Sequence, residues 1–456
     1  MDFRIERDSM GEMRVPSNKY WGAQTQRSLE NFEIGTEKMP TEVIKALGTI
    51  KLAAAEVNER LMPQRMPKKK SLAIAKAAEE VMSGALDESF PLVVWQTGSG
   101  TQTNMNVNEV IARRACELLG EGCVHPNDDV NMSQSSNDVF PSAMHIAAVL
   151  ETENRLLPAL SELVCTLAKL ETENIGAVKC GRTHLQDATP ISFSQEISGW
   201  RASVEADIDF IKESSDHLRA LALGATAVGT GLNAPKEFDI AITERLSDIL
   251  GTEFLAAENK FHAISSKSEL AFAHGALKAL AADLCKIAND IRWMSSGPRC
   301  GLGEIFIPEN EPGSSIMPGK VNPTQCEAIT MIAVQVMAND TAVAFAASQG
   351  NFELNVFMPV CIYNYLQSVR LLADGVRSFN KNCVSGIVAN REKMKENLYS
   401  SLMTATALTP IVGYENAAKA VKLAHSEGKT LKQACIELGI LTDEEFDKSY
   451  RPEEMI

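Results

Sequence analysis

The sequence lacks the features that mark several large classes of protein. It has no run of about 18 apolar residues, which a membrane-spanning helix needs, and no apolar stretch near its N-terminus that would resemble a secretory signal. Its ten cysteines are scattered, and no pair has the C-x-x-C spacing of zinc or iron–sulfur sites. These absences predict a soluble cytoplasmic protein with reduced thiols, no metal site and no cofactor.

The charge balance and the missing motifs disfavour several partners. The formal net charge of −15 opposes binding to nucleic acid or to an anionic membrane surface. The sequence contains no G-x-x-x-x-G-K-[ST], no G-x-G-x-x-G after a strand and no H-E-x-x-H. The segment 414–450 has the outline of a helix-turn-helix, but its tail is acidic, which disfavours DNA binding. A local basic patch is still compatible with the binding of a small anion.

Long helices dominate what the sequence does contain. In two segments, 268–294 and 362–379, apolar residues alternate three and four apart, the spacing of helices in a bundle. Further long helices are expected over three ranges: 141–171, 192–221 and 324–348. Pro158 is the expected position of a kink. Helices of this length, about 40 Å, favour an elongated bundle that forms the core of an oligomer.

The chain is long enough for more than one domain, since it has 456 residues, of which 45% are hydrophobic. Strand signals are sparse, so the predicted fold class is mainly α. We expect an N-terminal, mixed and mostly helical domain over 1–137, a central long-helix bundle over 138–390, and a small C-terminal helical domain over 391–456. A turn at Gly428 divides helices within the last of these.

Two polar loops precede predicted helices. The first is "WQTGSGTQTNMN", with Ser99, Gly100 and Thr101, and the second is "SQSSNDVFP", with Ser135, Ser136 and Asn137. Glycine allows close approach of the backbone, hydroxyls and amides donate hydrogen bonds, and a helix N-terminus attracts anions. Taken singly, each loop is also explained as an N-terminal helix cap. Together the two loops favour a site for a small anion.

Two further loops carry groups that transfer protons. "GRTHLQDATP" contains Thr183 and His184, and a loop histidine acts as a general acid or base when a carboxylate orients it. "EPGSSIMPGKVNP", residues 311–323, mixes glycines with prolines as a segment that closes over a ligand does. Its polar residues, and the acid that follows them, are Ser314, Ser315, Lys320, Asn322 and Glu327.

The residue types in the four loops suit chemistry on a small carboxylate. The α-carbon of a carboxylate loses a proton when fixed donors hold the doubly charged aci-carboxylate that forms. A leaving group on the β-carbon then departs with a proton from a general acid. Neutral donors, one lysine and one histidine provide these functions without a metal.

All four loops resemble motifs of the fumarase/aspartase superfamily, and of class II fumarases in particular. The similarity extends through "WGAQTQRSLENF", "IANDIRWMSSGPRCG" and "GNFELNVFMPV" to nearly the whole chain. His184 and Ser136 are the residues of fumarases, where aspartases have Gln and Thr. The resemblance implies a three-domain fumarase/aspartase-like fold, a homotetramer with a core of central helices, and metal-free, reversible hydration of fumarate to (S)-malate in the citric acid cycle.

The resemblance also implies roles for individual residues. Ser314 would take the C3 proton of malate, and His184, oriented by Glu327, would handle the proton of the C2 hydroxyl. Lys320 would stabilise the serine oxyanion, and the sequence leaves open whether Ser314 or His184 takes the carbon-bound proton. The residues implied to bind substrate are Ser99, Gly100, Thr101, Ser135, Ser136, Asn137, Thr183, Ser315, Lys320, Val321 and Asn322.

One departure from the family pattern concerns a second anion site. This site matches the sequence at His125, Pro126, Asn127 and Asp128, but Gly122 stands where an arginine is expected. We therefore expect weak anion binding there. Two alternatives to a fumarase stay open: another lyase of the superfamily, such as an aspartate ammonia-lyase, and a catalytically idle helical scaffold. The complete set of candidate catalytic residues argues against the scaffold.

Overall fold

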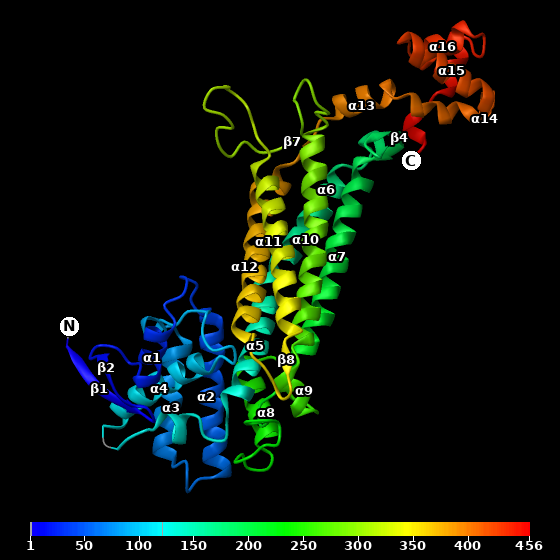
Figure 1. The fold of residues 1–456 in the computed structure, drawn as a ribbon. Helices are drawn as coiled ribbons and strands as arrows, with labels where there is room; N and C mark the ends of the chain where they lie inside the picture. Colours follow the sequence, from blue (N-terminus) through cyan, green and yellow to red (C-terminus); the bar gives the residue numbers. More distant parts are fainter. Residues whose placement is uncertain (1, 121) are drawn as a thin grey trace. The chain divides into compact units, whose positions relative to one another are not determined.

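The computed structural model describes residues 2–120 and 122–456 (Figure 1). The described residues are mainly helical, and their strands form five two-stranded sheets, which confirms the predicted mainly α fold class. Contacts divide the chain into unit 1, residues 1–158, 207–281 and 334–373, and unit 2, residues 159–206, 282–333 and 374–456. Several of these boundaries fall inside long helices. The division into three domains at residues 137 and 390 stays a prediction.

Unit 1 begins with a β-hairpin and a layer of helices, drawn in blue in Figure 1. β1 (Phe3–Asp8) pairs antiparallel with β2 (Gly11–Pro16). The helices that follow are α1 (Ala23–Asn31), α2 (Thr41–Leu61), α3 (Lys68–Met82) and α4 (Thr101–Leu119). α2 packs along α3, and α3 along α4. Both α2 and α3 bury several alanines, whose small side chains let neighbouring helices approach closely.

The remaining short elements of unit 1 support this layer. They are β5 (Ala220–Leu221), α8 (Phe238–Leu250), β6 (Leu255–Ala256), α9 (Lys260–Ser265), β8 (Gly350–Asn351) and β9 (Leu354–Asn355). α8 packs on α2, and β5 pairs in parallel with β6. Asp138, next to the second candidate loop, accepts the backbone N–H groups of Gly224 and Thr226, which follow β5.

Four long helices carry the predicted bundle pattern: α7 (Phe193–Asp216), α10 (Ser268–Met294), α11 (Thr324–Ala347) and α12 (Met358–Asn382). Both predicted apolar stripes are buried, on α10 at Leu270, Ala273, Leu277, Leu280, Leu284, Ile287, Ile291 and Met294, and on α12 at Ile362, Tyr365, Val369, Leu372, Val376 and Phe379. Within unit 1, His274 of α10 lies 3.1 Å from Asp340 of α11 and 2.8 Å from Ser368 of α12. This buried polar cluster fixes which turns of the three helices face one another.

The predicted long helix over 141–171 is present, with a local irregularity inside it. α5 (Ser136–Glu151) begins earlier, at a capping box, and a π-helical turn, η3 (Thr152–Leu156), separates it from α6 (Leu157–Glu173). Pro158 lacks the N–H that would donate to the preceding turn, and the wider π turn directly before it accommodates that loss. The irregularity expected at Pro158 is therefore present as a π-helical turn.

Helix α11 is unusually apolar. Among the described residues it is the one helix long and apolar enough to cross a membrane by length and composition, with a mean hydropathy of 1.4 over its best window, 28% of which is buried. Core helices of bundles meet the same criterion. Its Asp340 binds His274 and Lys278, as a polar residue inside a bundle does. On another face α11 exposes Met331, Val334 and Phe345.

Unit 2 contains a β-hairpin and the C-terminal helices. Its remaining elements are β3 (Val178–Thr183), β4 (Gln186–Ser192), β7 (Ile305–Phe306), β10 (Val388–Ala389), α13 (Arg391–Ser400), α14 (Thr409–Val412), α15 (Tyr414–Glu427), α16 (Leu431–Glu437) and α17 (Asp443–Ser449). Phe446 and Tyr450 lie in the small core of the C-terminal helices. Gly428, with φ 64°, ends α15, which confirms the predicted turn.

Candidate active site

The first candidate loop, Thr97–Gly100, leads into α4 of unit 1. Gly100 caps the helix with φ 70°, and a Cβ atom there would come within 2.4 Å of the Phe140 ring. At Gly98 a Cβ atom would lie 1.5 Å from the carbonyl oxygen of Val356. The loop conformation thus requires glycine at both positions, as the sequence led us to expect.

The hydroxyls of this loop lie together at the start of α4. Ser99 Oγ is 2.8 Å from Thr101 Oγ1. The N–H of Thr103 donates to Gln96 Oε1 at 3.0 Å, whereas in the described residues no side chain caps the N–H groups of Thr101 and Gln102. Two adjacent hydroxyls beside two uncapped N–H groups form a set of donors suited to a carboxylate.

The second candidate loop, Ser135–Asn137, begins α5. Ser135 Oγ accepts the N–H of Asn137 at 3.2 Å, and Asp138 Oδ1 accepts the N–H of Ser135 at 2.9 Å, so the expected helix cap is present as a capping box. Asn104 of α4 donates from Nδ2 to Ser136 Oγ at 2.9 Å. Because Ser136 accepts this bond, its own hydroxyl proton is left to donate to a ligand. The contact joins the first two candidate loops.

A buried polar cluster lies next to the second loop, and the sequence analysis missed it. Lys51 of α2, which is 0% exposed, donates from Nζ to Asn131 Oδ1 and Gln134 Oε1, both at 2.9 Å. Burial lowers the pKa of Lys51 to about 7, although the charge of Asp138 opposes this. Burial raises the pKa of Asp138 to about 6, while backbone N–H groups and Lys51 oppose that change. A lysine within the apolar run "GTIKLAAA" was the available signal.

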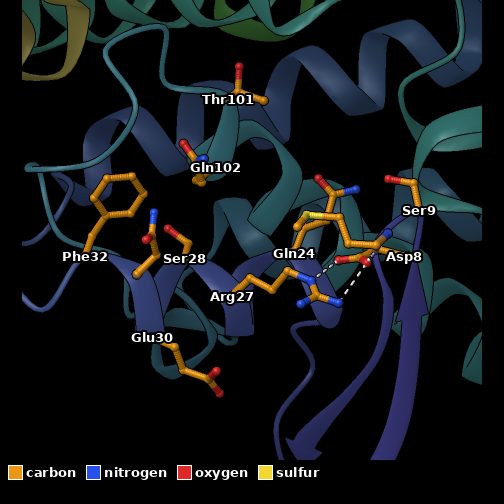
Figure 2. A pocket seen from close by; sticks show the side chains of 11 residues that line it. Asp8, Ser9, Gln24, Arg27, Ser28, Glu30, Phe32, Thr101 and Gln102 are labelled. Carbon is orange, nitrogen blue, oxygen red and sulfur yellow. Dashed lines mark hydrogen bonds and ion pairs between the residues drawn. The ribbon is translucent and has the colours of Figure 1, made fainter.

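A cavity of about 560 Å³ opens beside Thr101 (Figure 2). Arg27 lies in this cavity and binds Asp8, with Nε at 2.7 Å from Oδ2 and Nη2 at 3.1 Å from Oδ1. The hydrogen bond from Arg27 is the main reason that the pKa of Asp8 is lowered. Because Asp8 already neutralises Arg27, the arginine does not serve as a free cation for a carboxylate bound near Thr101.

The third candidate loop is the turn between β3 and β4 in unit 2. His184 and Leu185 form this two-residue turn with φ 57° and 60°. Such a turn favours asparagine or glycine, so a leucine in it is strained. His184 is exposed, and its side chain makes no hydrogen bond to any described residue. A strained turn that presents an imidazole is typical of a functional position.

A buried ion cluster anchors this hairpin. Arg182 donates to both carboxylate oxygens of Glu304, at 3.0 Å from Nη1 and 2.7 Å from Nη2. Lys179 lies 3.2 Å from the same carboxylate, and Asn397 donates to it at 3.1 Å. Burial raises the pKa of Glu304, but the bonds from Arg182 and the charge of Lys179 outweigh burial and hold the pKa below its ordinary value. The cluster therefore fixes the strand that ends at Thr183.

The fourth candidate loop, 311–323, closes on itself. The N–H of Gly313 donates to the carbonyl of Lys320 at 3.0 Å, and Asn322 Nδ2 donates to the carbonyl of Gly313 at 2.7 Å. A Cβ atom at Gly313 would lie 2.1 Å from the Lys320 oxygen, so this closure requires glycine. Asn322 thus has a structural role in the loop, whatever else it binds.

The hydroxyl oxygen of Ser314 lies where backbone N–H groups would stabilise a negative charge on it. This Oγ accepts the backbone N–H groups of Ile316 at 3.3 Å and Met317 at 3.1 Å. Donors fixed on a hydroxyl oxygen stabilise its alkoxide, which is the condition for a serine to act as a base. Lys320 is exposed and forms no ion pair with a described residue.

The structure brings together some of the predicted residues and not others. Ser99 meets Thr101, and the first loop meets the second through Asn104 and Ser136. Within unit 2, among the residues described for a single chain, no hydrogen bond joins His184 to Glu327, and the predicted orientation of the histidine by this acid stays a prediction. The expected contributions of the other substrate-binding residues in unit 2 also stay predictions: Thr183, Ser315 and Val321.

The residues of the predicted second anion site form a local structure of their own. His125 caps the short π-helix η2 (Pro126–Val130), and its Nδ1 accepts the N–H of Asp128 at 3.2 Å. The Asp128 carboxylate lies 3.2 Å from the same nitrogen. Gly122 has φ 95° and, having no side chain, adds no charge. A second anion bound here would be repelled by the Asp128 carboxylate, and Gly122 provides no arginine side chain to attract it.

Over residues 2–120 and 122–456, no group of three His, Cys, Asp or Glu side chains is arranged to hold a metal ion, and none of the ten cysteines is in a disulfide.

A lyase family model matches residues 11–338, and a fumarase C C-terminus model matches residues 405–456. Class II fumarate hydratases are close relatives: that of Bacillus subtilis is 58% identical, and that of Helicobacter pylori 60%, each over 100% of this chain and 99% of the relative.

A solved structure extends this similarity to the fold. The crystal structure of a recombinant class II fumarase from Schistosoma mansoni superposes with a TM-score of 0.96 at 44% identity, over 100% of this chain and 99% of that chain. The resemblance found in the four sequence motifs is thereby confirmed over the full length of the chain. This protein belongs to the class II fumarate hydratase family of lyases.

Proposed function

We propose that this protein catalyses the reversible hydration of fumarate to (S)-malate as a metal-independent step of the citric acid cycle in the cytoplasm. Full-length similarity to class II fumarate hydratases supports the reaction. The structural observation that carries it is the pair of backbone N–H groups on Ser314 Oγ. An oxygen held in this way suits removal of a proton from carbon, which is the demanding step of the reaction.

The donors of unit 1 hold the substrate carboxylates in this proposal. They are Ser99, Gly100, Thr101, Ser135, Ser136 and Asn137. The paired hydroxyls of the first loop and the bond from Asn104 to Ser136 support this role. Five residues of unit 2 complete the site: Thr183, Ser315, Lys320, Val321 and Asn322. Neutral donors in fixed positions stabilise the aci-carboxylate more than they stabilise the ground-state substrate.

The proton transfers fall to the loops of unit 2. In the direction of malate dehydration, Ser314 as alkoxide takes the C3 proton, and the electron pair of the C–H bond moves into the aci-carboxylate. His184, oriented by Glu327, gives a proton to the C2 hydroxyl, which leaves as water while the double bond of fumarate forms. Lys320 stabilises the serine oxyanion. Hydration follows the same steps in reverse.

We propose a homotetramer in which each site takes loops from different chains. Met331, Val334 and Phe345 of α11 are 68%, 69% and 65% exposed in a single chain, an apolar face that a second copy would cover. His184 and Glu327, both exposed, would gain their missing partners in such an assembly. Native mass spectrometry tests the proposed state, and a monomer at micromolar concentration would contradict it.

The assay that tests the function follows the loss of fumarate absorbance at about 240 nm on mixing with the protein, with and without ammonia. Turnover without ammonia is the expected result. Turnover that requires ammonia would identify an ammonia-lyase, and no turnover of a correctly folded protein would favour the scaffold. Because no structural observation favours either alternative, we keep the hydratase as the single proposal.

A further inference from the structure

We infer that Lys51 is a positioning residue that supplies the positive charge beneath the carboxylate-binding loop Ser135–Asn137 without touching the substrate. The inference rests on the site proposed above, in which Ser136 binds a substrate carboxylate. An ammonium group that is 0% exposed is costly to bury, and its neighbours along α2, Ile50 and Leu52, are apolar core residues. A position that served packing alone would hold an apolar side chain.

Hydrogen bonds lead from Lys51 to the proposed ligand-binding hydroxyl. Lys51 Nζ donates to Asn131 Oδ1 at 2.9 Å, and the same oxygen accepts Asn104 Nδ2 at 3.2 Å. Asn104 Nδ2 also donates to Ser136 Oγ at 2.9 Å. The second bond of Lys51, to Gln134 Oε1, holds the residue directly before Ser135. The ammonium group of Lys51 thus holds the loop through Gln134. Through Asn131 it also orients the amide of Asn104, which leaves the Ser136 hydroxyl proton available to a ligand.

The charges around Lys51 are few. Within the described residues, Asp138 of α5 is the one ionisable group whose charge acts on it. The elements on its other sides present neutral amides, those of Asn131 and Gln134. The proposed carboxylate donors of unit 1 are also neutral, and Arg27 beside Thr101 is already paired with Asp8. A carboxylate bound at Ser136 is therefore linked to the buried positive charge of Lys51 through Asn131 and Asn104.

This arrangement couples dicarboxylate binding to the protonation of Lys51. Burial brings the pKa of Lys51 to about 7 in the free protein. A bound anion favours the charged form of the amine, so binding and protonation reinforce each other. As pH rises through the free-protein pKa, the amine loses its proton and affinity for the dicarboxylate falls. Arginine at this position would stay charged and would remove that loss.

The test measures the affinity for succinate, a saturated dicarboxylate that cannot be hydrated, by calorimetry between about pH 6 and pH 9. In wild type, the dissociation constant should rise about tenfold over this range, a typical size for coupling between two sites. Lys51→Arg should reduce that rise, because only the amine of wild type deprotonates. Every other titratable group is common to the two proteins, so the difference between them isolates Lys51. Lys51→Met should bind weakly at every pH.

Catalysis gives a second readout. Lys51→Met should raise KM about tenfold and change kcat little, since Lys51 does not touch the reacting atoms. The exposed Lys45 of the same helix provides a matched control, and Lys45→Met should match wild type in affinity and in pH profile. An equal fall of kcat and kcat/KM with unchanged KM would overturn the inference, because it would show that Lys51 does not contribute to substrate binding.

Two further outcomes distinguish a failure of the proposed carboxylate site from a failure of the inference about Lys51. If Ser136→Ala leaves succinate affinity unchanged, the proposed site itself is wrong. If Ser136→Ala weakens binding while wild type shows no pH dependence, or Lys51→Arg shows the same dependence as wild type, then the inference about Lys51 alone is overturned. The titrations of wild type and Lys51→Arg decide the point even if Lys51→Met does not fold.

Discussion

The candidate loops of unit 1 and those of unit 2 differ in how far their contacts are complete in one chain. In unit 1, Ser136 is held by Asn104, and both lie in a network of buried amides. In unit 2, the side chains of His184, Lys320 and Glu327 are exposed and have no partner among the described residues. The comparison indicates that the proposed carboxylate donors of unit 1 are already ordered within one chain, whereas His184, Lys320 and Glu327 of unit 2 lack side-chain partners among its described residues.

Backbone conformation shows the same contrast. The second loop begins α5 with a capping box around Ser135, an unstrained and common arrangement. The hairpin turn of unit 2 holds His184 and Leu185 in left-handed conformations that non-glycine residues avoid. Strain of this kind persists only where surrounding contacts enforce it, and here Arg182 and Glu304 provide them. Substitutions of the proposed donors in unit 1 should therefore change mainly binding, and those of His184 and Ser314 in unit 2 mainly turnover.

The largest expected effect concerns sharing of the site between chains. Ser314→Ala and His184→Asn should each lower kcat by at least about 100-fold, since each removes one proton-transfer group. When the two variants are refolded together, half of the sites take Ser314 from an intact donor, and half of those take an intact His184. Recovery of roughly a quarter of wild-type activity is expected for a closed symmetric oligomer. The measurement is fumarate turnover per chain.

Native mass spectrometry provides the control for this mixing experiment, because it shows whether mixed tetramers have formed. If mixed tetramers form and activity stays at the level of the single variants, Ser314 and His184 act within one chain. The contrast between complete and incomplete loops would then need another explanation. Two Ser314→Ala preparations refolded together serve as the matched negative control.

A smaller effect is expected at the anchor of the hairpin. Glu304→Gln leaves Arg182 without its counter-charge, while Lys179 keeps its ion pair with Glu196, and breaking a buried pair costs about 3–5 kcal/mol. The melting temperature should fall, and kcat should fall with it, because the turn that carries His184 loses its support. KM should change less than kcat, since Thr183 is the one proposed substrate-binding residue on the strand that this cluster supports.

The exposed Glu309 lies in the same segment and offers the control Glu309→Gln, which should melt as wild type does. A raised KM with unchanged kcat in Glu304→Gln would contradict the proposed separation of binding from turnover. Calorimetry and steady-state kinetics on the same preparations distinguish these results.

The long helices were predictable because their burial has a period. Every apolar residue of the stripes on α10 and α12 is buried, since a bundle helix must turn the same stripe towards its neighbours over its whole length. Capping at Ser135 was predictable for a similar local reason, as polar residues before a helix satisfy its first N–H groups. An irregularity at Pro158 was predictable from the proline, but its π-helical form was not, because a π turn preserves the apolar pattern approximately.

The supports of the site were not predictable from local sequence. Lys51 binds Asn131 and Gln134, and Arg182 binds Glu304, so each contact joins residues far apart in the chain. A charged residue within an apolar run can be exposed at the edge of a helix or buried in a network, and periodicity does not separate the two cases. The four motif loops were found because many unusual residues lie close together in sequence.

The preorganised network of unit 1 predicts a pH-dependent effect on stability. Folding lowers the pKa of Lys51 from 10.5 to about 7, so between these values the folded state binds fewer protons than the unfolded state. The contribution of Lys51 to the free energy of unfolding of wild type therefore rises with pH between these two pKa values. Lys51→Met lacks this contribution. The stability of Lys51→Met relative to wild type should be greatest near pH 7 and decline by up to about 1.4 kcal/mol per pH unit above it.

Urea unfolding at several pH values measures this difference. The carboxyl of Asp138, whose pKa is about 6, is already ionised over most of the window and contributes little to the slope. Lys45→Met should run parallel to wild type, because Lys45 is exposed. A constant difference between Lys51→Met and wild type across the window would show that Lys51 is not forced towards its neutral form on folding.

The smallest expected effect is at His125, in unit 1 but outside the preorganised donors. Its Nδ1 already faces the N–H and the carboxylate of Asp128, and Gly122 brings no positive charge. A dicarboxylate there would meet the repulsion of an acid with no arginine to offset it. His125→Asn should therefore leave KM and kcat within about twofold of wild type, as surface substitutions away from a site usually do. Crystals soaked in low millimolar malate should show the ligand near Ser99 and none at His125, and ordered dicarboxylate at His125 would mean that preorganisation in unit 1 extends to a second site.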